Sequence, residues 1–154
     1  MSTYSAMNEI KKQIISKIEN LTDVQIVYPV ETLNPSGWPA VFVKISDMDG
    51  EFSSTAENAR VYSYSVLVLF PLGQDFVPEA EKDRLDYAES LVGTVVDEIV
   101  NAIDTDFELD SLPNDTTVLF VKAADCLWGE YDYEGGKAKA AQITLNVYTE
   151  VTVV

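Results

Sequence analysis

Residues 38–70 read WPAVFVKISDMDGEFSSTAENARVYSYSVLVLF, and this stretch decides the fold. Residues 40–45 are nearly all apolar or β-favouring, whereas residues 61–70 alternate aromatic and aliphatic side chains with serines before the run becomes fully apolar. These two runs predict an antiparallel pair of strands. The polar segment between them, residues 46–60, contains the turn dipeptide Asp49-Gly50 and lacks the periodicity of a segment fixed to a core. We therefore predict a long β-hairpin arm with a projecting tip.

One amphipathic helix is expected before this arm in the sequence and a second one after it. The first covers residues 5–20, where apolar residues recur at steps of three and four: Met7, Ile10, Ile14, Ile18 and Leu21. The second begins near Pro78, with Glu79 and Glu81 at the positive end of the helix dipole, and runs to about Ile103. Its apolar stripe is Leu85, Ala88, Val92, Val95, Val96, Ile99 and Ile103. Gly93 on this helix suggests close packing against the sheet.

Further strands are predicted at residues 24–28, at residues 117–122, and in a hairpin that starts at Cys126 and turns at Gly135-Gly136. The order is then helix, about four strands, helix, and three strands. This order predicts an α+β fold, in which two helices pack on a largely antiparallel β-sheet and the hairpin arm projects. The 154 residues fit one domain, residues 1–154.

The charge and composition exclude several classes of protein. Twenty-six acidic against ten basic side chains give a formal charge of -16, which repels nucleic-acid phosphates and anionic lipid headgroups. Cys126 is the only cysteine, so no internal disulfide forms, and its apolar neighbours predict a buried thiol. No apolar run is long enough to span a membrane, and the polar N-terminal residues do not resemble a signal peptide. We expect synthesis in a reducing cytoplasm.

Catalytic and cofactor-binding patterns are missing from the sequence. There is no histidine, and neither GxxxxGK[ST] nor GxGxxG occurs. The acidic pairs Asp47/Asp49 and Asp104/Asp106 begin no EF-hand-like loop, so calcium binding is not favoured. Glu130 and Asp132 could serve a carboxylate-based hydrolase, but a half-exposed strand with Tyr131 and Tyr133 on its other face explains the same alternation. We expect no enzyme activity, no catalytic residue, no metal and no cofactor.

The order of elements, and two short motifs, resemble the tail terminator (tail-completion) proteins of long-tailed bacteriophages. Gly37-Trp38-Pro39-Ala40 is similar to the small-aromatic-Pro-Ala start of the family's first long strand. Residues 57–66, ENARVYSYSV, are similar to the family's arm, in which a Glu-Asn pair precedes an arginine and an aromatic-rich strand. The resemblance covers most of the chain.

The resemblance implies a structural virion protein. It implies a homohexameric ring at the head-proximal end of the tail tube, which stops tube polymerisation and offers a joining surface to the head-side connector or stopper protein. Assembly would take place in the host cytoplasm, and the mature location would be the tail or neck of the virion. DNA would pass through the ring without specific binding, since acidic walls do not retain it. No membrane is involved.

The candidate site residues fall into two groups. The expected subunit contacts are Trp38, Phe52, Glu57, Asn58 and Arg60. The expected channel-facing carboxylates are Asp47, Asp49, Glu51, Glu130, Asp132 and Glu134. Trp38 could equally be a loop aromatic at the core edge, and Arg60 is expected to pair with a carboxylate. Two alternatives remain open: a neck or connector protein of the same head-tail interface, and a soluble acidic binding module that mimics DNA.

Overall fold

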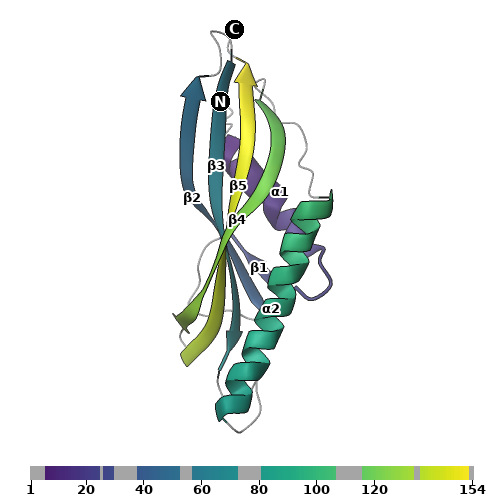
Figure 1. Cartoon of the computed structure of the whole chain (residues 1–154), viewed down its shortest axis with the longest axis vertical. Helices are drawn as coiled ribbons and strands as arrows, with labels where there is room; N and C mark the ends of the chain where they lie inside the picture. The colour runs from purple at the N-terminus through teal and green to yellow at the C-terminus, as the bar shows by residue number, and fades with distance from the viewer. Residues whose placement is uncertain are drawn as a thin grey trace.

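The computed structural model describes residues 6–24, 26–29, 38–52, 57–72, 81–106, 116–133 and 136–152. These residues form two helices and five strands (Figure 1). In chain order they are α1 (Ala6–Glu19), β1 (Ile26–Tyr28), β2 (Ala40–Phe52), β3 (Glu57–Pro71), α2 (Glu81–Asp106), β4 (Thr116–Tyr133) and β5 (Gly136–Thr152). The predicted α+β class is confirmed. Neither helix is long and apolar enough within these residues to cross a membrane.

The five strands form one sheet in the order β1-β2-β3-β5-β4. Only the short β1 pairs in parallel, with Ile26 opposite Ala40 and Tyr28 opposite Phe42. All other neighbours are antiparallel, and β3 pairs with β5 without interruption from Glu57 to Pro71. The predicted hairpin of residues 40–70 is present, from the pair Ala40/Leu69 to the pair Phe52/Asn58. β2 ends and β3 begins at one end of the long, twisted sheet, and β4 ends and β5 begins at the other end (Figure 1).

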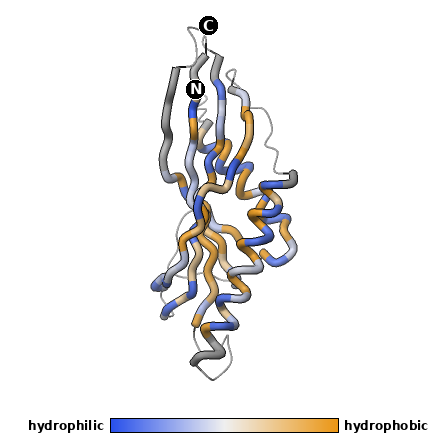
Figure 2. Tube along the Cα trace, in the orientation of Figure 1, coloured by the Kyte–Doolittle hydropathy of each residue, from blue (hydrophilic) through white to orange (hydrophobic). Residues whose placement is uncertain are grey.

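Both helices lie on one face of the sheet, and the main core lies between them and the strands. Every second residue of β3 and β5 points into this core, from Tyr62 to Phe70 and from Ala141 to Val147. The apolar stripes of the helices meet them with Ile10, Ile14 and Ile18 from α1, and with Ala88, Val92, Val95, Val96, Ile99 and Ile103 from α2. Figure 2 shows hydrophobic residues gathered in the strands where they pass alongside α2. The apolar periodicity therefore identified this face correctly.

The opposite face carries a second, smaller cluster that is built on aromatic rings. Buried Ala40, Phe42, Leu67, Leu69, Ala138 and Ala140 form its base. Tyr28 and Tyr131 each contact Phe42 edge to face, with ring centroids 5.7 and 5.8 Å away. Trp38 contacts Tyr133 in the same manner at 5.0 Å. Because β2 and β4 are separated by β3 and β5, these contacts require the sheet to curl toward this face.

Two expectations about the strands are wrong. β4 is one strand of 18 residues, not a strand at 117–122 followed by a separate one. Register shifts between Val118 and Phe120 and between Ala123 and Asp125 break the alternation, so one strand looked like two in the sequence. Asp49-Gly50 is not a turn, because both residues lie within β2 opposite Val61 and Arg60.

Cys126 was predicted to be buried, and this is also wrong. The thiol is exposed, because β4 is an edge strand whose outer side no described strand covers. Partial burial, with a smaller contribution from Asp97 on α2, raises the pKa of this thiol. Gly93 does face the sheet as expected, but a Cβ there would lie 3.8 Å from Cη2 of Trp128, an ordinary van der Waals distance.

Candidate functional site: the open edges of the sheet

The outer edge of β4 is the most unusual surface of the described chain. β4 pairs with β5 along its whole length, and no other described strand pairs with it. Edge strands in soluble proteins are usually short or carry charges that discourage pairing with another chain. This edge instead exposes four large apolar side chains, with fractional exposures of 54% for Leu119, 54% for Phe120, 67% for Leu127 and 45% for Trp128. Its composition is typical of an interaction surface.

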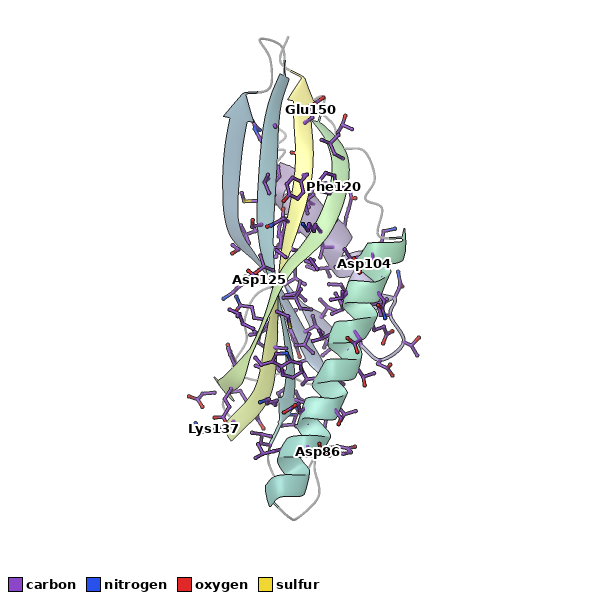
Figure 3. All side chains as sticks on the ribbon, viewed as in Figure 1. Asp86, Asp104, Phe120, Asp125, Lys137 and Glu150 are labelled. Carbon is purple, nitrogen blue, oxygen red and sulfur yellow. The ribbon has the colours of Figure 1, made fainter. Side chains whose placement is uncertain are left out.

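The apolar side chains of β4 are fixed in place by their neighbours on β5. The ring of Phe120 stacks on that of Tyr148, with centroids 4.3 Å apart and planes 20° apart. Figure 3 shows Phe120 on the upper part of β4 and Asp125 where β4 crosses the centre of the sheet. Lys139 places its Nζ 5.9 Å from the centre of the Trp128 ring. These contacts hold Phe120 and Trp128 in place, so less conformational entropy is lost when a partner binds.

The second open edge belongs to β2. β1 covers β2 only from Ala40 to Phe42, so no described strand pairs with the outer side of residues 43–52. This stretch forms one side of the predicted arm, and Ile45 within it is 37% exposed. Ser46 has no opposite residue in β3, because the register shifts between Ile45 and Asp47. Among the described strands, the sheet therefore has a long open edge on each side.

The structure places the expected subunit contacts as follows. Trp38 is half-buried and packs against both clusters of the chain's own core, as a loop aromatic at the core edge does. Arg60 is half-buried in β3, and its backbone carbonyl accepts a hydrogen bond of 3.1 Å from Oγ1 of Thr149. Its pairing with a carboxylate stays a prediction. Phe52, Glu57 and Asn58 lie on the arm backbone, but their side chains are outside the described residues.

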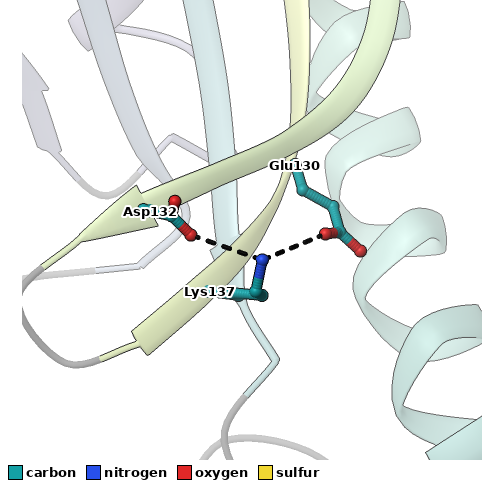
Figure 4. A network of polar contacts seen from close by, with 3 residues as sticks. All are labelled: Glu130, Asp132 and Lys137. Carbon is teal, nitrogen blue, oxygen red and sulfur yellow. Dashed lines mark ion pairs between the residues drawn. The ribbon is translucent and has the colours of Figure 1, made fainter.

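The expected channel carboxylates are split between two regions. Asp47, Asp49 and Glu51 occupy β2 next to its open edge, although their side chains are outside what the structure describes. Glu134 lies outside the described residues altogether. Lys137 forms ion pairs with Glu130 at 3.7 Å and with Asp132 at 3.6 Å (Figure 4).

Glu130 and Asp132 lie on the helix-covered face of the sheet. Glu130 is opposite Lys139, and Lys139 forms an ion pair of 3.8 Å with Glu89 on α2. An acid pair neutralised by one lysine is a poor candidate for a general acid and base, which need two carboxylates free to exchange protons. The pair therefore has the geometry of a surface ion-pair network.

Two hollows in the described surface do not combine into a catalytic site. One of about 240 Å³ is lined by Lys44, Leu67, Leu127, Tyr131 and Gln142 on the face away from the helices. Another of about 240 Å³ lies between Trp38, α2 and the turn at residues 22–24. No group of three or more His, Cys, Asp or Glu side chains in the described ranges is placed to hold a metal ion.

The turn beside the second hollow is fixed to α2 by Glu98. Its carboxylate accepts hydrogen bonds from the backbone N–H of Asp23, at 3.4 Å to Oε1 and 3.3 Å to Oε2. Partial burial, followed by contact with the carboxyl of Asp23, raises the pKa of Glu98. The turn that follows α1 is in this way anchored to the middle of α2, which is a structural role.

The sequence signalled only part of this surface. Residues 40–70 identified the arm, but the exposed β4 residues were assigned to ordinary strands, because an apolar residue on an edge strand has the same sequence pattern as one in a core. The pair Leu119-Phe120 was the available signal, since two adjacent large apolar residues cannot both face the core of a regular strand. No protein-family model matches the chain, and no curated protein sequence matches it.

Proposed function

We propose that this protein is a structural subunit that assembles with copies of itself into a ring, in the manner of a phage tail terminator. The observation that carries the proposal is the β4 edge, an 18-residue strand with four exposed large apolar side chains. An edge of this length and composition is normally covered in the working form of a protein. A closed ring covers every such edge, because each copy offers one edge to the next.

The remaining features agree with a structural role at the end of a tail tube. The ring would stop polymerisation of the tube protein and present a joining surface to the head-side connector or stopper. The charge of -16 suits a passage for DNA, because carboxylates on the wall repel the phosphates instead of binding them. Asp49 and Glu51 on the arm are the better candidates for that wall, since Glu130 and Asp132 are already paired with Lys137.

Negative-stain electron microscopy tests the proposal directly. The purified protein is imaged alone and after mixing with isolated tail tubes. We expect rings with a central hole, or tubes whose one end is closed by an added layer. Caps at the head end support a terminator, whereas rings that bind only the portal side support a neck protein. Single copies that ignore tubes would overturn the proposal, and binding to a basic partner that weakens steeply with salt would then identify a DNA mimic.

A further inference from the structure

The two open edges of the sheet span the same rows of paired residues, and their strands run in opposite directions. At the lower end of the open β2 edge, one row of paired residues crosses β2, β3, β5 and β4 in turn: Val43, Val66, Ile143 and Cys126. At the upper end the corresponding row across the same four strands is Phe52, Asn58, Val151 and Thr116. Residues 43–52 and residues 116–126 therefore lie at the same level on opposite sides of the sheet.

Strand direction is also complementary. β2 is antiparallel to β3, β3 to β5, and β5 to β4, so β4 runs opposite to β2. A second copy placed beside the first in the same orientation would set its β2 antiparallel to β4 of the first copy. Such a pairing is heterologous and can continue around a ring, unlike a symmetric pairing of two β4 edges. Antiparallel pairing also forms the most favourable ladder of backbone hydrogen bonds.

Charges at the two edges match on two rungs of the sheet, where a rung is the row of residues opposite one another across the strands. One rung consists of Lys122 on β4, Asn146 on β5, Ser63 on β3 and Asp47 on β2. It places a basic residue at the β4 edge and an acidic residue at the β2 edge. Another runs Asp125, Thr144, Ser65, Lys44, with the signs reversed. In a level neighbour, Lys122 would be opposite Asp47, and Asp125 opposite Lys44. Oppositely charged residues that face each other across an antiparallel pair stabilise it.

We infer that residues 116–126 of β4 pair with residues 43–52 of β2 from a second copy, in the level antiparallel register set by Lys122/Asp47 and Asp125/Lys44. The inference rests on the proposed ring and names its interface. Leu119 and Phe120 become buried at this junction, which accounts for their exposure in the single chain. Leu127 is excluded from it, because its rung ends at Phe42, whose outer side is occupied by Tyr28 of β1.

Charge reversal tests the register by sedimentation equilibrium of the full chain. Lys122→Glu should weaken self-association about tenfold, because an attractive pair becomes a repulsive one. Asp47→Lys should weaken it by a similar factor, although it lowers the net negative charge. The double variant should restore the wild-type constant. The control Lys12→Glu, an exposed position on α1, should change little. Strengthened association in Asp47→Lys, or no rescue in the double variant, would overturn the register.

A mixing experiment tests which edge meets which. Leu119→Glu/Phe120→Glu closes the β4 edge, and deletion of residues 46–60 removes most of the open β2 edge, including Asp47, while Leu127→Glu serves as the matched β4 control. Circular dichroism and urea unfolding first confirm that each chain is folded. Each closed variant should be monomeric alone, and the two mixed should form a one-to-one dimer and nothing larger. Dimers of the arm-deleted chain alone would show symmetric β4 pairing and overturn the inference.

The two proposals can fail separately. A wild-type chain that stays monomeric up to about 1 mM, yet caps tail tubes, would overturn the edge pairing and leave the terminator function standing. A chain that associates through these edges but does not bind tubes would overturn the terminator function and leave the edge pairing standing.

Discussion

The rings of Phe42 and Tyr131 meet edge to face, 5.8 Å apart, although the strands that carry them are separated by two others. The contact is possible because β5, one of the two strands between them, carries small residues here, Ala138 and Ala140, both buried. The curl of the sheet toward this face is therefore stabilised by aromatic side chains from strands at its two sides. The contact adds to the pairing with β5 in holding the lower part of β4.

Tyr131→Ala should lower the free energy of unfolding by about 2 kcal/mol, because a half-buried ring and its edge-to-face contact are lost. Urea denaturation measures the change. Asp132→Ala is the matched control, since this exposed neighbour on the opposite face pairs only with exposed Lys137 among the contacts described here, and it should cost less than about 0.5 kcal/mol. Equal losses in the two variants would show that the aromatic contact contributes nothing to stability.

Tyr64→Phe should destabilise the fold by about 1–2 kcal/mol. The buried hydroxyl of Tyr64 donates a hydrogen bond of 2.6 Å to the backbone carbonyl of Met7 and so fixes α1 to the sheet. The phenylalanine variant removes this hydrogen bond between the sheet and α1. Tyr148→Phe, on a half-buried ring that keeps its stacking on Phe120, should change stability little.

The same side chain gives a pH dependence. Burial raises the pKa of Tyr64 above its ordinary value, and nearby Tyr62 adds to the shift. The contribution of the neutral hydroxyl is complete below the unfolded-state pKa of about 10 and is lost as the pH rises toward the higher folded-state pKa. The stability difference between wild type and Tyr64→Phe should therefore shrink above pH about 10. A constant difference through that range would contradict the assignment.

Two glycines should respond in opposite ways to alanine. Gly93→Ala should raise stability by roughly 0.5–1 kcal/mol, since it is in the interior of α2 and the new methyl would only touch Trp128 at 3.8 Å. Gly136→Ala should cost at least about 1 kcal/mol, because its φ of 136° is a conformation that side chains rarely adopt. Thermal unfolding compares the two, and a loss of stability in Gly93→Ala would show that the helix packs more tightly than the distance indicates.

Glu98→Gln should stabilise the protein slightly at neutral pH, by less than about 1 kcal/mol at this mostly solvated site. Glutamine keeps an oxygen that accepts from the N–H of Asp23 but removes the repulsion between the two carboxylates. Because the folded-state pKa of Glu98 is raised, its favourable contribution is present below the unfolded-state value and is lost as the pH rises. The advantage of the variant should therefore vanish on titration to acidic pH. An advantage that persists in acid would point to packing instead of charge.

The sequence predicted the helices well because their apolar residues recur with helical spacing and face one core. Observed α1, Ala6–Glu19, and α2, Glu81–Asp106, lie within a few residues of the predicted spans. The arm was predicted for a similar reason, since strongly β-favouring runs flank it. The full length of β4 was not predicted from the sequence. The extra residues Leu119 and Ala124 at its two register shifts disrupt the alternation on which strand prediction depends. The exposure of Cys126 follows from the position of β4 at the edge, which only the strand order reveals.

The opposite placement of the two hairpin ends has a consequence for any larger assembly. In each copy the paired ends of β2 and β3, here called the tip, lie at one end of the sheet, and the paired ends of β4 and β5, here called the turn, lie at the other (Figure 1). Copies that continue one another's sheet without inversion collect all tips on one rim and all turns on the other. The two rims then differ in sequence, with residues 49–52 and 57–58 on one and residues 132–133 and 136–137 on the other. In the proposed ring, two unlike rims would bind different neighbours above and below, and the strand order of a single chain would then set the direction of the joint.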